Sequence, residues 1–276
     1  MSSRLTTLRH VLTQQKRRVP CDIEPGRNSV NKGWPQLDSS GISIWDEFIL
    51  PNLNASYGHV LDLAIPEELV AVPQASQALA GISLSKEQDM NYLMGWNDGV
   101  LKKTLQFAQA HLDLHRGIVL NHSVVATDTS ALVIVSDGDR KAWVTHLIEL
   151  DNYPGPTRLV VGLARSSSKW SGRNVASQLE NGVKTEHIWP LRQLANACKL
   201  AGTPYGYIQT DKEQVVCRFD LNTADLKVAI MPIPWSQYDS TVLTTDLALW
   251  WLCMLAMANI GSSPSFHSQG GPSGRG

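Results

Sequence analysis

The chain has 276 residues, of which 43% are hydrophobic and 18% charged, and its formal net charge at pH 7 is −1. This composition is typical of a soluble globular protein with one large or two modest domains. The four cysteines lie far apart without CxxC spacing, which argues against a zinc site or a disulfide framework and favours a reducing setting. We therefore expect an intracellular, cytoplasmic location, with the nucleus left open.

The N-terminal part is predicted to hold little regular structure. Residues 1–41 are expected to form a flexible lead, because they begin with a basic stretch and continue with a loop rich in Gly, Ser, Asn and Pro. Residues 42–82 are expected to form a helical or irregular extension packed on the core. Within it, a helix is predicted over Trp45 to Leu50 that stops at Pro51, since proline disfavours helical geometry in the residue before it.

A core domain is predicted over residues 83–260. Apolar residues recur every three or four positions from Leu84 to Leu114, after Ser83 and Ser85 as candidate N-caps, which predicts one long helix or two short ones broken near Gly95 and Gly99. Apolar and β-branched runs predict strands over Gly117–Asn121, Ser130–Val135, Ala142–Leu150, Leu159–Gly162, Tyr205–Thr210, Val215–Phe219 and Val228–Ile233.

Two further helices are predicted, over Trp189–Ala201 and over Leu247–Ile260. The second is preceded by Thr244, Thr245 and Asp246 as capping residues. It is shorter than the roughly 20 residues that a bilayer requires, so we expect no membrane span. Its apolar character makes a homo-oligomer contact conceivable, with burial in its own domain as the default. The tail from Gly261 is expected to be disordered.

The order helix, strands, helix, strand resembles the PD-(D/E)xK nuclease superfamily, and more narrowly its fungal nuclease-like proteins. The resemblance rests on Gly162 to Ser171, Pro190 to Gln193, Tyr205 to Glu213 and the ending Leu247 to Leu252. It covers about residues 120 to 260. It implies an α/β fold with a restriction-endonuclease-like core, in which a central mixed sheet is flanked by helices.

In that superfamily an acid, one residue and a lysine stand on the active strand and bind Mg²⁺ together with further acids. The matching positions here are Leu163, Ala164 and Arg165, so the acid is replaced by leucine and the lysine by arginine. Leucine supplies no oxygen ligand, and arginine is too weak an acid to carry a proton readily. The resemblance further implies Asp128 as the preceding-strand acid and Gln193 as the helix glutamine. The first-helix acid stays open among Glu87, Asp89 and Asp98.

The candidate site combines these positions with nearby polar and aromatic side chains. Its expected catalytic residues are Asp128, Glu149, Arg165, Lys169 and Gln193, and its expected substrate-binding residues are His146, Leu163, Trp170 and Trp189. Each has a plainer interpretation: the acids as turn formers, the cations as solvated surface groups, and most of the nine tryptophans as core residues.

Three functions follow. The favoured one is a repurposed nuclease fold that binds a small organic molecule without a metal cofactor, as a cyclase- or isomerase-type enzyme of fungal specialised metabolism. The second is a Mg²⁺- or Mn²⁺-dependent nuclease whose acid has moved, for example to Glu149 or Asp151. The third is a non-catalytic nucleic-acid-binding module that uses the basic segment 158–199, in which seven Lys or Arg stand against two acids.

Overall fold

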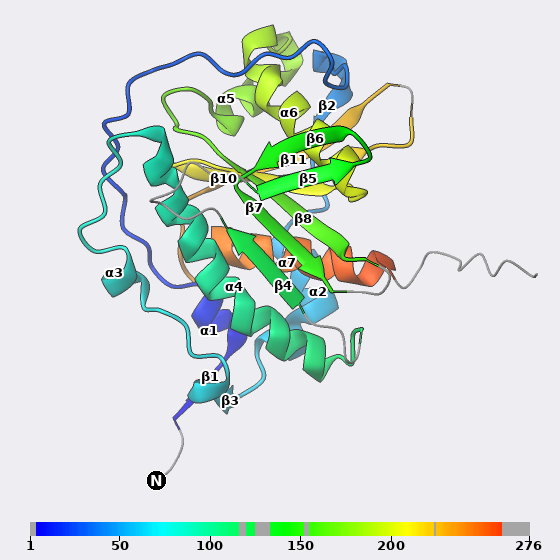
Figure 1. The fold of residues 1–276 in the computed structure, drawn as a ribbon. Helices are drawn as coiled ribbons and strands as arrows, with labels where there is room; N and C mark the ends of the chain where they lie inside the picture. The colour runs from blue at the N-terminus through cyan, green and yellow to red at the C-terminus, as the bar shows by residue number, and fades with distance from the viewer. Residues whose placement is uncertain (1–3, 116–119, 125–132, 152–154, 224, 261–276) are drawn as a thin grey trace, which may run out of the picture.

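The computed structural model describes residues 4–115, 120–124, 133–151, 155–223 and 225–260. Its centre is a seven-stranded mixed sheet with the strand order β2-β11-β10-β9-β8-β7-β4 (Figure 1). The strands and their bounds are β2 Ile42–Ile44, β4 Leu120–Val124, β7 His146–Leu150, β8 Thr157–Ala164, β9 Tyr205–Gln209, β10 Glu213–Asp220 and β11 Lys227–Pro234. Within this sheet β8 pairs with β9 and β2 with β11 in parallel, and the other pairs are antiparallel.

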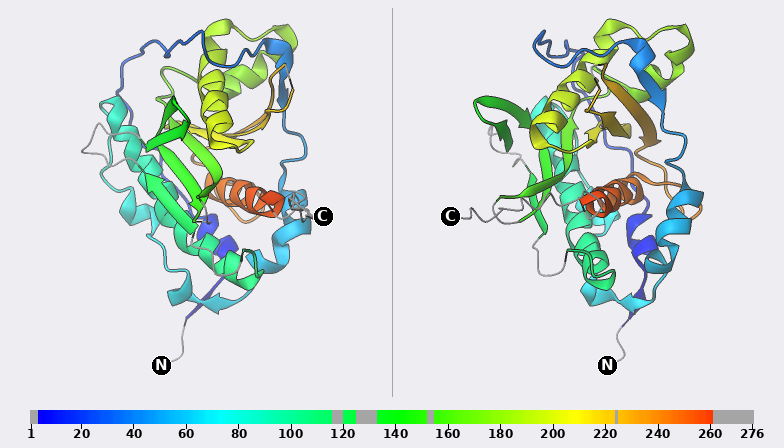
Figure 2. Two further views of the ribbon diagram at one scale, coloured as in Figure 1. Left: turned by 45° about the vertical axis from the view of Figure 1, so that its right-hand side comes forward. Right: turned by 90° about the vertical axis from the view of Figure 1, so that its right-hand side faces the viewer.

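Helices cover both faces of the sheet, so the fold is a mixed α/β fold with three layers. The helices α4 (Asn91–His111) and α7 (Thr245–Ile260) pack on one face of the sheet, and α6 (Thr185–Ala201) packs on the other (Figures 1 and 2). In the sequence, α6 lies between the strands β8 and β9. Short elements complete the fold: β1 Leu5–Thr6, α1 Leu8–Leu12, η1 Ser39–Gly41, α2 Leu50–Leu61, β3 Ile65–Pro66, η2 Glu67–Leu69, α3 Ala75–Ala78, η3 Glu87–Met90, β5 Val133–Asp137, β6 Arg140–Val144, α5 Gly172–Ser177 and η4 Leu179–Asn181.

The helix α7 lies in the larger of the two hydrophobic clusters, the one on the α4 side of the sheet. Trp250 and Trp251 are 0% and 4% exposed, and its apolar side chains are buried within the chain's own core. Six of the nine tryptophans are buried, which confirms that most of them are core residues. Among the described residues, no helix has the combination of length and hydropathy that crossing a membrane would need.

The N-terminal lead is not loose, contrary to the prediction. Leu8 and Leu12 of α1 are fully buried, and the helix is capped by Thr7, whose side chain accepts a hydrogen bond from the backbone N–H of His10. Lys16 is also buried: its Nζ lies 2.5 Å from Asp246 Oδ1 at the start of α7 and over the ring of Trp235. The first ordered element is therefore near Leu5 and not near Ile42.

One prediction that involves proline is wrong, and one predicted strand that contains proline is present. The helix near Pro51 is α2, which begins at Leu50, because a proline in the first turn lacks only an N–H that has no helical partner there. The strand β11 continues through Pro232 and Pro234. This is possible because β2 pairs only with Val228 to Ile230, so both prolines lie where that edge of β11 has no neighbouring strand.

The segment predicted as one strand over Ala142–Leu150 is divided at Thr145, whose backbone N–H and hydroxyl both donate to the carbonyl oxygen of Gly162 at 3.0 Å. β6 turns back on β5 and forms a separate hairpin that packs on α6, while β7 enters the main sheet. The expected order helix, strands, helix, strand is present as α4, β4, β7, β8, α6 and β9, with the β5–β6 hairpin inserted.

Candidate functional site

A core leucine occupies the strand position where the resemblance implies an acid. Leu163 is 2% exposed, pairs in register with Ile208 of β9, and belongs to the core between the sheet and α6. The structure brings Arg165 and Gln193 together: the Arg165 guanidinium donates to Gln193 Oε1 on α6 and, at 2.7 Å, to the carbonyl oxygen of Ala164. Burial lowers the pKa of Arg165, and the carboxylate of Glu87 opposes that effect.

Lys169 is also held by neighbouring groups. Its Nζ lies 2.5 Å from Glu87 Oε2, and its carbonyl oxygen accepts a hydrogen bond from Asn28 Nδ2 at 3.2 Å. Glu87 is thus a first-helix candidate that reaches this region. Asp89 instead caps the start of the helix, where one of its carboxylate oxygens accepts from the backbone of Ser85 and Lys86.

These residues do not form a set of metal ligands. A divalent ion such as Mg²⁺ takes several oxygen ligands. Leu163 offers only a hydrocarbon, and Arg165 and Lys169 add positive charge beside the carboxylate of Glu87. In the part of the chain that the structure describes, no cluster of three His, Cys, Asp or Glu could hold an ion. Asp128 lies outside the described residues.

Glu149 does not join Arg165. It stands on β7 opposite Arg158, at the beginning of β8, seven residues before Arg165. Seven residues of strand span about 23 Å at roughly 3.3 Å per residue. Burial raises the pKa of Glu149 above its usual range, with Arg158 acting in the opposite direction.

His146 lies on the opposite face of the sheet from α6. It is fully buried, and its Nδ1 is 2.6 Å from the hydroxyl of Tyr207, whose pKa is raised by burial. Asn97 of α4 donates to Gln209 Oε1 at 3.1 Å, and Gln214 donates to the same oxygen at 3.0 Å. His146 is therefore part of a buried polar cluster and not of the Arg165 region.

The two predicted tryptophans have different environments. Trp170 is 2% exposed, and its indole N–H donates to the carbonyl oxygen of His187 at 2.8 Å, so it is a core residue. Trp189 is partly exposed on α6, with the Arg192 guanidinium 4.2 Å above its ring. Trp189 and Lys169 line a cavity of about 350 Å³, here called the strap pocket, whose other wall is the N-terminal segment 26–30.

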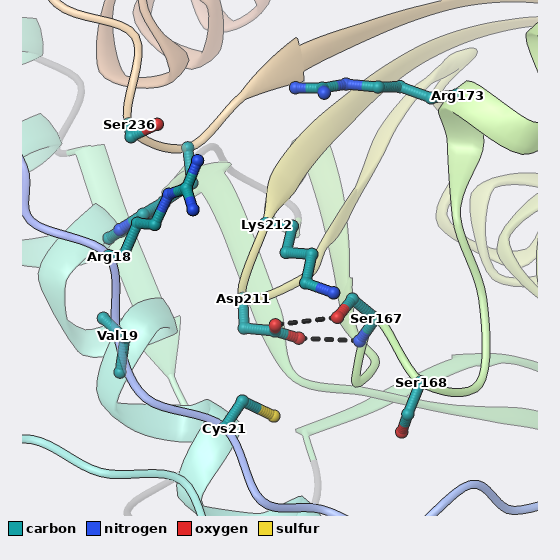
Figure 3. Close-up of a pocket in the computed structure, with 10 residues that line it drawn as sticks. Arg18, Val19, Cys21, Ser167, Ser168, Arg173, Asp211, Lys212 and Ser236 are labelled. Carbon is teal, nitrogen blue, oxygen red and sulfur yellow. Dashed lines mark hydrogen bonds between the residues drawn. The ribbon is translucent and has the colours of Figure 1, made fainter.

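A second cavity of about 350 Å³, here called the sheet-end pocket, is lined in part by the loop that follows β8 (Figure 3). Four segments far apart in the sequence form it: the N-terminal segment, the loop after β8 with the start of α5, the β9–β10 turn, and the end of β11. Its lining residues are Arg18, Val19, Cys21, Ser167, Ser168, Arg173, Asp211, Lys212, Trp235 and Ser236.

One carboxylate fixes the geometry of this pocket. The two oxygens of Asp211 accept hydrogen bonds from the backbone N–H and the hydroxyl of Ser167, at 2.6 and 2.7 Å. The bonds join the β9–β10 turn to the loop after β8. Burial raises the pKa of the nearby Cys21 thiol, and the Asp211 carboxylate adds to that effect.

The charges of the sheet-end pocket are mainly positive. Arg18 and Lys212 form no side-chain hydrogen bond or ion pair with any residue that the structure describes, whereas Arg173 lies 3.4 Å from Glu213. In Figure 3 the Lys212 side chain is directed toward Ser167, with Arg18 on one side and Arg173 on the other.

None of the predicted site residues that the structure describes lines the sheet-end pocket. Sequence reasoning missed it because no local spacing links residues 18, 173 and 212; the one available signal was the turn Asp211 to Glu213 within the resemblance. No model of a known protein family, no curated protein and no solved structure matches this chain.

Proposed function

We propose that this chain has a PD-(D/E)xK-like fold that has lost the nuclease metal site, and that it binds a small organic molecule in the sheet-end pocket. The order of α4, β4, β7, β8, α6 and β9 supports the fold. The observation that carries the proposed function is the place of the pocket: it opens where the parallel strands β8 and β9 end.

Ligands of α/β sheets bind outside the carboxyl ends of the parallel strands, because loops of both strands meet there. The loop after β8 and the turn after β9 both contribute to this pocket, through Ser167 and Asp211. The volume of about 350 Å³ falls in the range of small-molecule sites. Its lining combines an indole and a valine with several hydroxyl and charged groups, which is the mixture that orients an organic ligand.

The loss of the metal site is supported by the burial of Leu163. A side chain that is 2% exposed and packed under α6 belongs to the core, so restoring an acid there requires a charge in an apolar environment. Arg165 and Lys169 have protein partners in Gln193 and Glu87. The region that would hold the ion is thus occupied by a leucine and two internally bonded cations.

A cyclase or isomerase activity in specialised metabolism stays a prediction. Asp211 is the carboxylate of the sheet-end pocket, and both of its oxygens accept hydrogen bonds from Ser167. A carboxylate in that position is suited to orient a bound molecule. Four residues expected to be catalytic, Glu149, Arg165, Lys169 and Gln193, do not line this pocket, so the proposal made here is for ligand binding.

The thiol of Cys21 provides a test of the binding site. Of the four cysteines, Cys21 is half-buried in the pocket, whereas Cys198, Cys217 and Cys253 are fully buried. A fragment library of small organic molecules is screened for slowing the alkylation of Cys21 by iodoacetamide, measured by intact-protein mass spectrometry. We expect protecting fragments whose effect is lost in Ser168→Trp, which fills the pocket. A library in which no fragment protects Cys21 would refute the proposal.

The alternatives predicted from the sequence give other results with the same protein. A nuclease whose metal-binding acid has moved to another position cleaves single- or double-stranded DNA or RNA when Mg²⁺ or Mn²⁺ is added. A nucleic-acid-binding module retains an oligonucleotide without cleavage, and its affinity falls steeply with salt.

A further inference from the structure

The cations around the sheet-end pocket are the starting point for a more specific assignment. Arg18, Arg173 and Lys212 line the pocket together with one carboxylate, Asp211. They come from three separate segments, so their gathering is a property of the fold and not of a basic stretch of sequence.

Two of these cations have no internal counter-charge. Arg18 and Lys212 are exposed, and neither forms a side-chain ion pair or hydrogen bond with the residues that the structure describes. Elsewhere the exposed Arg140 pairs with Asp137, and the partly buried Arg9 pairs with Asp62. Asp211 carries one negative charge and Glu213 pairs with Arg173, so the three cations exceed these two carboxylates by one positive charge. A concave surface with an excess of one charge concentrates ions of the opposite sign.

Hydroxyl groups accompany the cations. Ser167, Ser168 and Ser236 belong to the lining. Arginine offers a planar fork of donors that matches the oxygens of a phosphate or a carboxylate, and hydroxyls add neutral donors to the remaining oxygens. The Ser167 hydroxyl donates to Asp211, which leaves the hydroxyls of Ser168 and Ser236 for a ligand. Three cations with these two hydroxyls suit a group that has several oxygens and two negative charges better than a group with one charge.

We propose that the sheet-end pocket binds an organic ligand through a phosphate group, held by Arg18, Arg173 and Lys212. This inference rests on the proposed function, since it names the ligand class of the same site. The organic part of the ligand lies toward Val19 and Cys21, because Trp235 is 1% exposed and offers almost no surface.

Three probes with one ring and different polar groups test the ligand class: phenyl phosphate, benzoate and benzyl alcohol. The dissociation constant of each is measured by ligand-observed NMR, and protection of Cys21 from iodoacetamide shows whether binding is in the pocket. We expect phenyl phosphate to bind at least about tenfold more tightly than benzyl alcohol, with benzoate between them.

Matched variants identify the residues that hold the phosphate. Arg18→Met and Arg173→Met should each weaken phenyl phosphate about tenfold, because each removes charge-assisted hydrogen bonds. Arg140→Met is the control: it removes the same charge from the exposed turn between β5 and β6, outside the pocket, and should change the dissociation constant less than about twofold. Thermal melting of each variant checks that the fold is intact.

The outcomes separate the two proposals. If all three probes protect Cys21 equally, the pocket stands and the phosphate assignment is refuted. If none protects Cys21 and none binds, both fail. A single-stranded oligonucleotide of about twelve nucleotides is the remaining probe. The assignment is overturned if this oligonucleotide binds more tightly than phenyl phosphate and if Arg140→Met weakens its binding as much as Arg18→Met does. In that case the cations bind nucleic acid over a broad surface and not a phosphate group in the pocket.

Discussion

Substituting Leu163 by glutamate tests whether the position at which the resemblance implies a metal-binding acid is part of the core. Leu163 is 2% exposed, and the strand β8 directs it into the cluster under α6. We predict that Leu163→Glu lowers the free energy of unfolding by about 5 kcal/mol at pH 7, from two contributions. The lost burial of leucine accounts for about 2 kcal/mol, and keeping the carboxyl group neutral in the core, by raising its pKa by roughly two units or more, accounts for about 3 kcal/mol.

The introduced carboxyl group also gives the variant a pH dependence of known sign. Its pKa in the folded protein lies above its value in the unfolded chain, so the charge-related penalty is absent well below pH 4 and grows as the pH rises toward neutrality, at about 1.4 kcal/mol per pH unit. Arg165, two residues further along the strand, is already bonded to Gln193 and offers only partial compensation.

The assay is urea unfolding of the whole chain, followed by tryptophan fluorescence at several pH values. Leu163→Met serves as the volume-matched control, with an expected loss below about 1.5 kcal/mol. Leu163→Gln separates polarity from charge, since its penalty should not change with pH. The reasoning is refuted if Leu163→Glu is as stable as the parent at pH 7, or if Mg²⁺ stabilises it strongly, because either result would show an open site at this position.

Three further substitutions test the packing that positions the pocket. Lys16→Met should lower the free energy of unfolding by about 3–5 kcal/mol, because it leaves the buried Asp246 without its cation. Adding Asp246→Leu to this variant should recover part of the loss, measured by thermal unfolding. An unchanged melting temperature in the single variant would contradict the buried pair. Gly162→Ala should lower the free energy of unfolding by about 1–3 kcal/mol, since a Cβ there would lie 2.6 Å from the Tyr207 ring. The control is Gly95→Ala in α4, where a Cβ meets open space, and it should raise the free energy of unfolding by up to about 1 kcal/mol. Leu8→Ala should cost about 2–5 kcal/mol in urea unfolding, whereas a loose N-terminal lead would leave stability unchanged.

The elements that the sequence predicts well are those with a long local period. The helix α4 continues through Gly95 and Gly99 because the apolar spacing on both sides stays in phase. The turn between β9 and β10 is also local, since Thr210 Oγ1 accepts from the backbone of Lys212 and Glu213. Such features depend on residues that are neighbours in the chain.

The errors arise where distant parts of the chain decide the structure. Leu8, Val11 and Leu12 have helical spacing behind a threonine cap, but their burial depends on the core that they join. Arg165 and Gln193, which both belong to the predicted candidate site, are hydrogen-bonded. Glu149 lies on β7 opposite the beginning of β8, and His146 lies on the other face of the sheet. The sheet-end pocket is formed by four separate segments, and the charge excess that defines it exists only in the folded chain.

The most direct test of the central claim is an anomalous difference map from crystals of the full chain grown with Mn²⁺. The account predicts no manganese peak beside Leu163, where Arg165 and Lys169 are bonded to Gln193 and Glu87. A manganese ion bound by carboxylate oxygens next to Leu163, at about 2.0–2.6 Å as for hard cations, would contradict it and restore the nuclease interpretation.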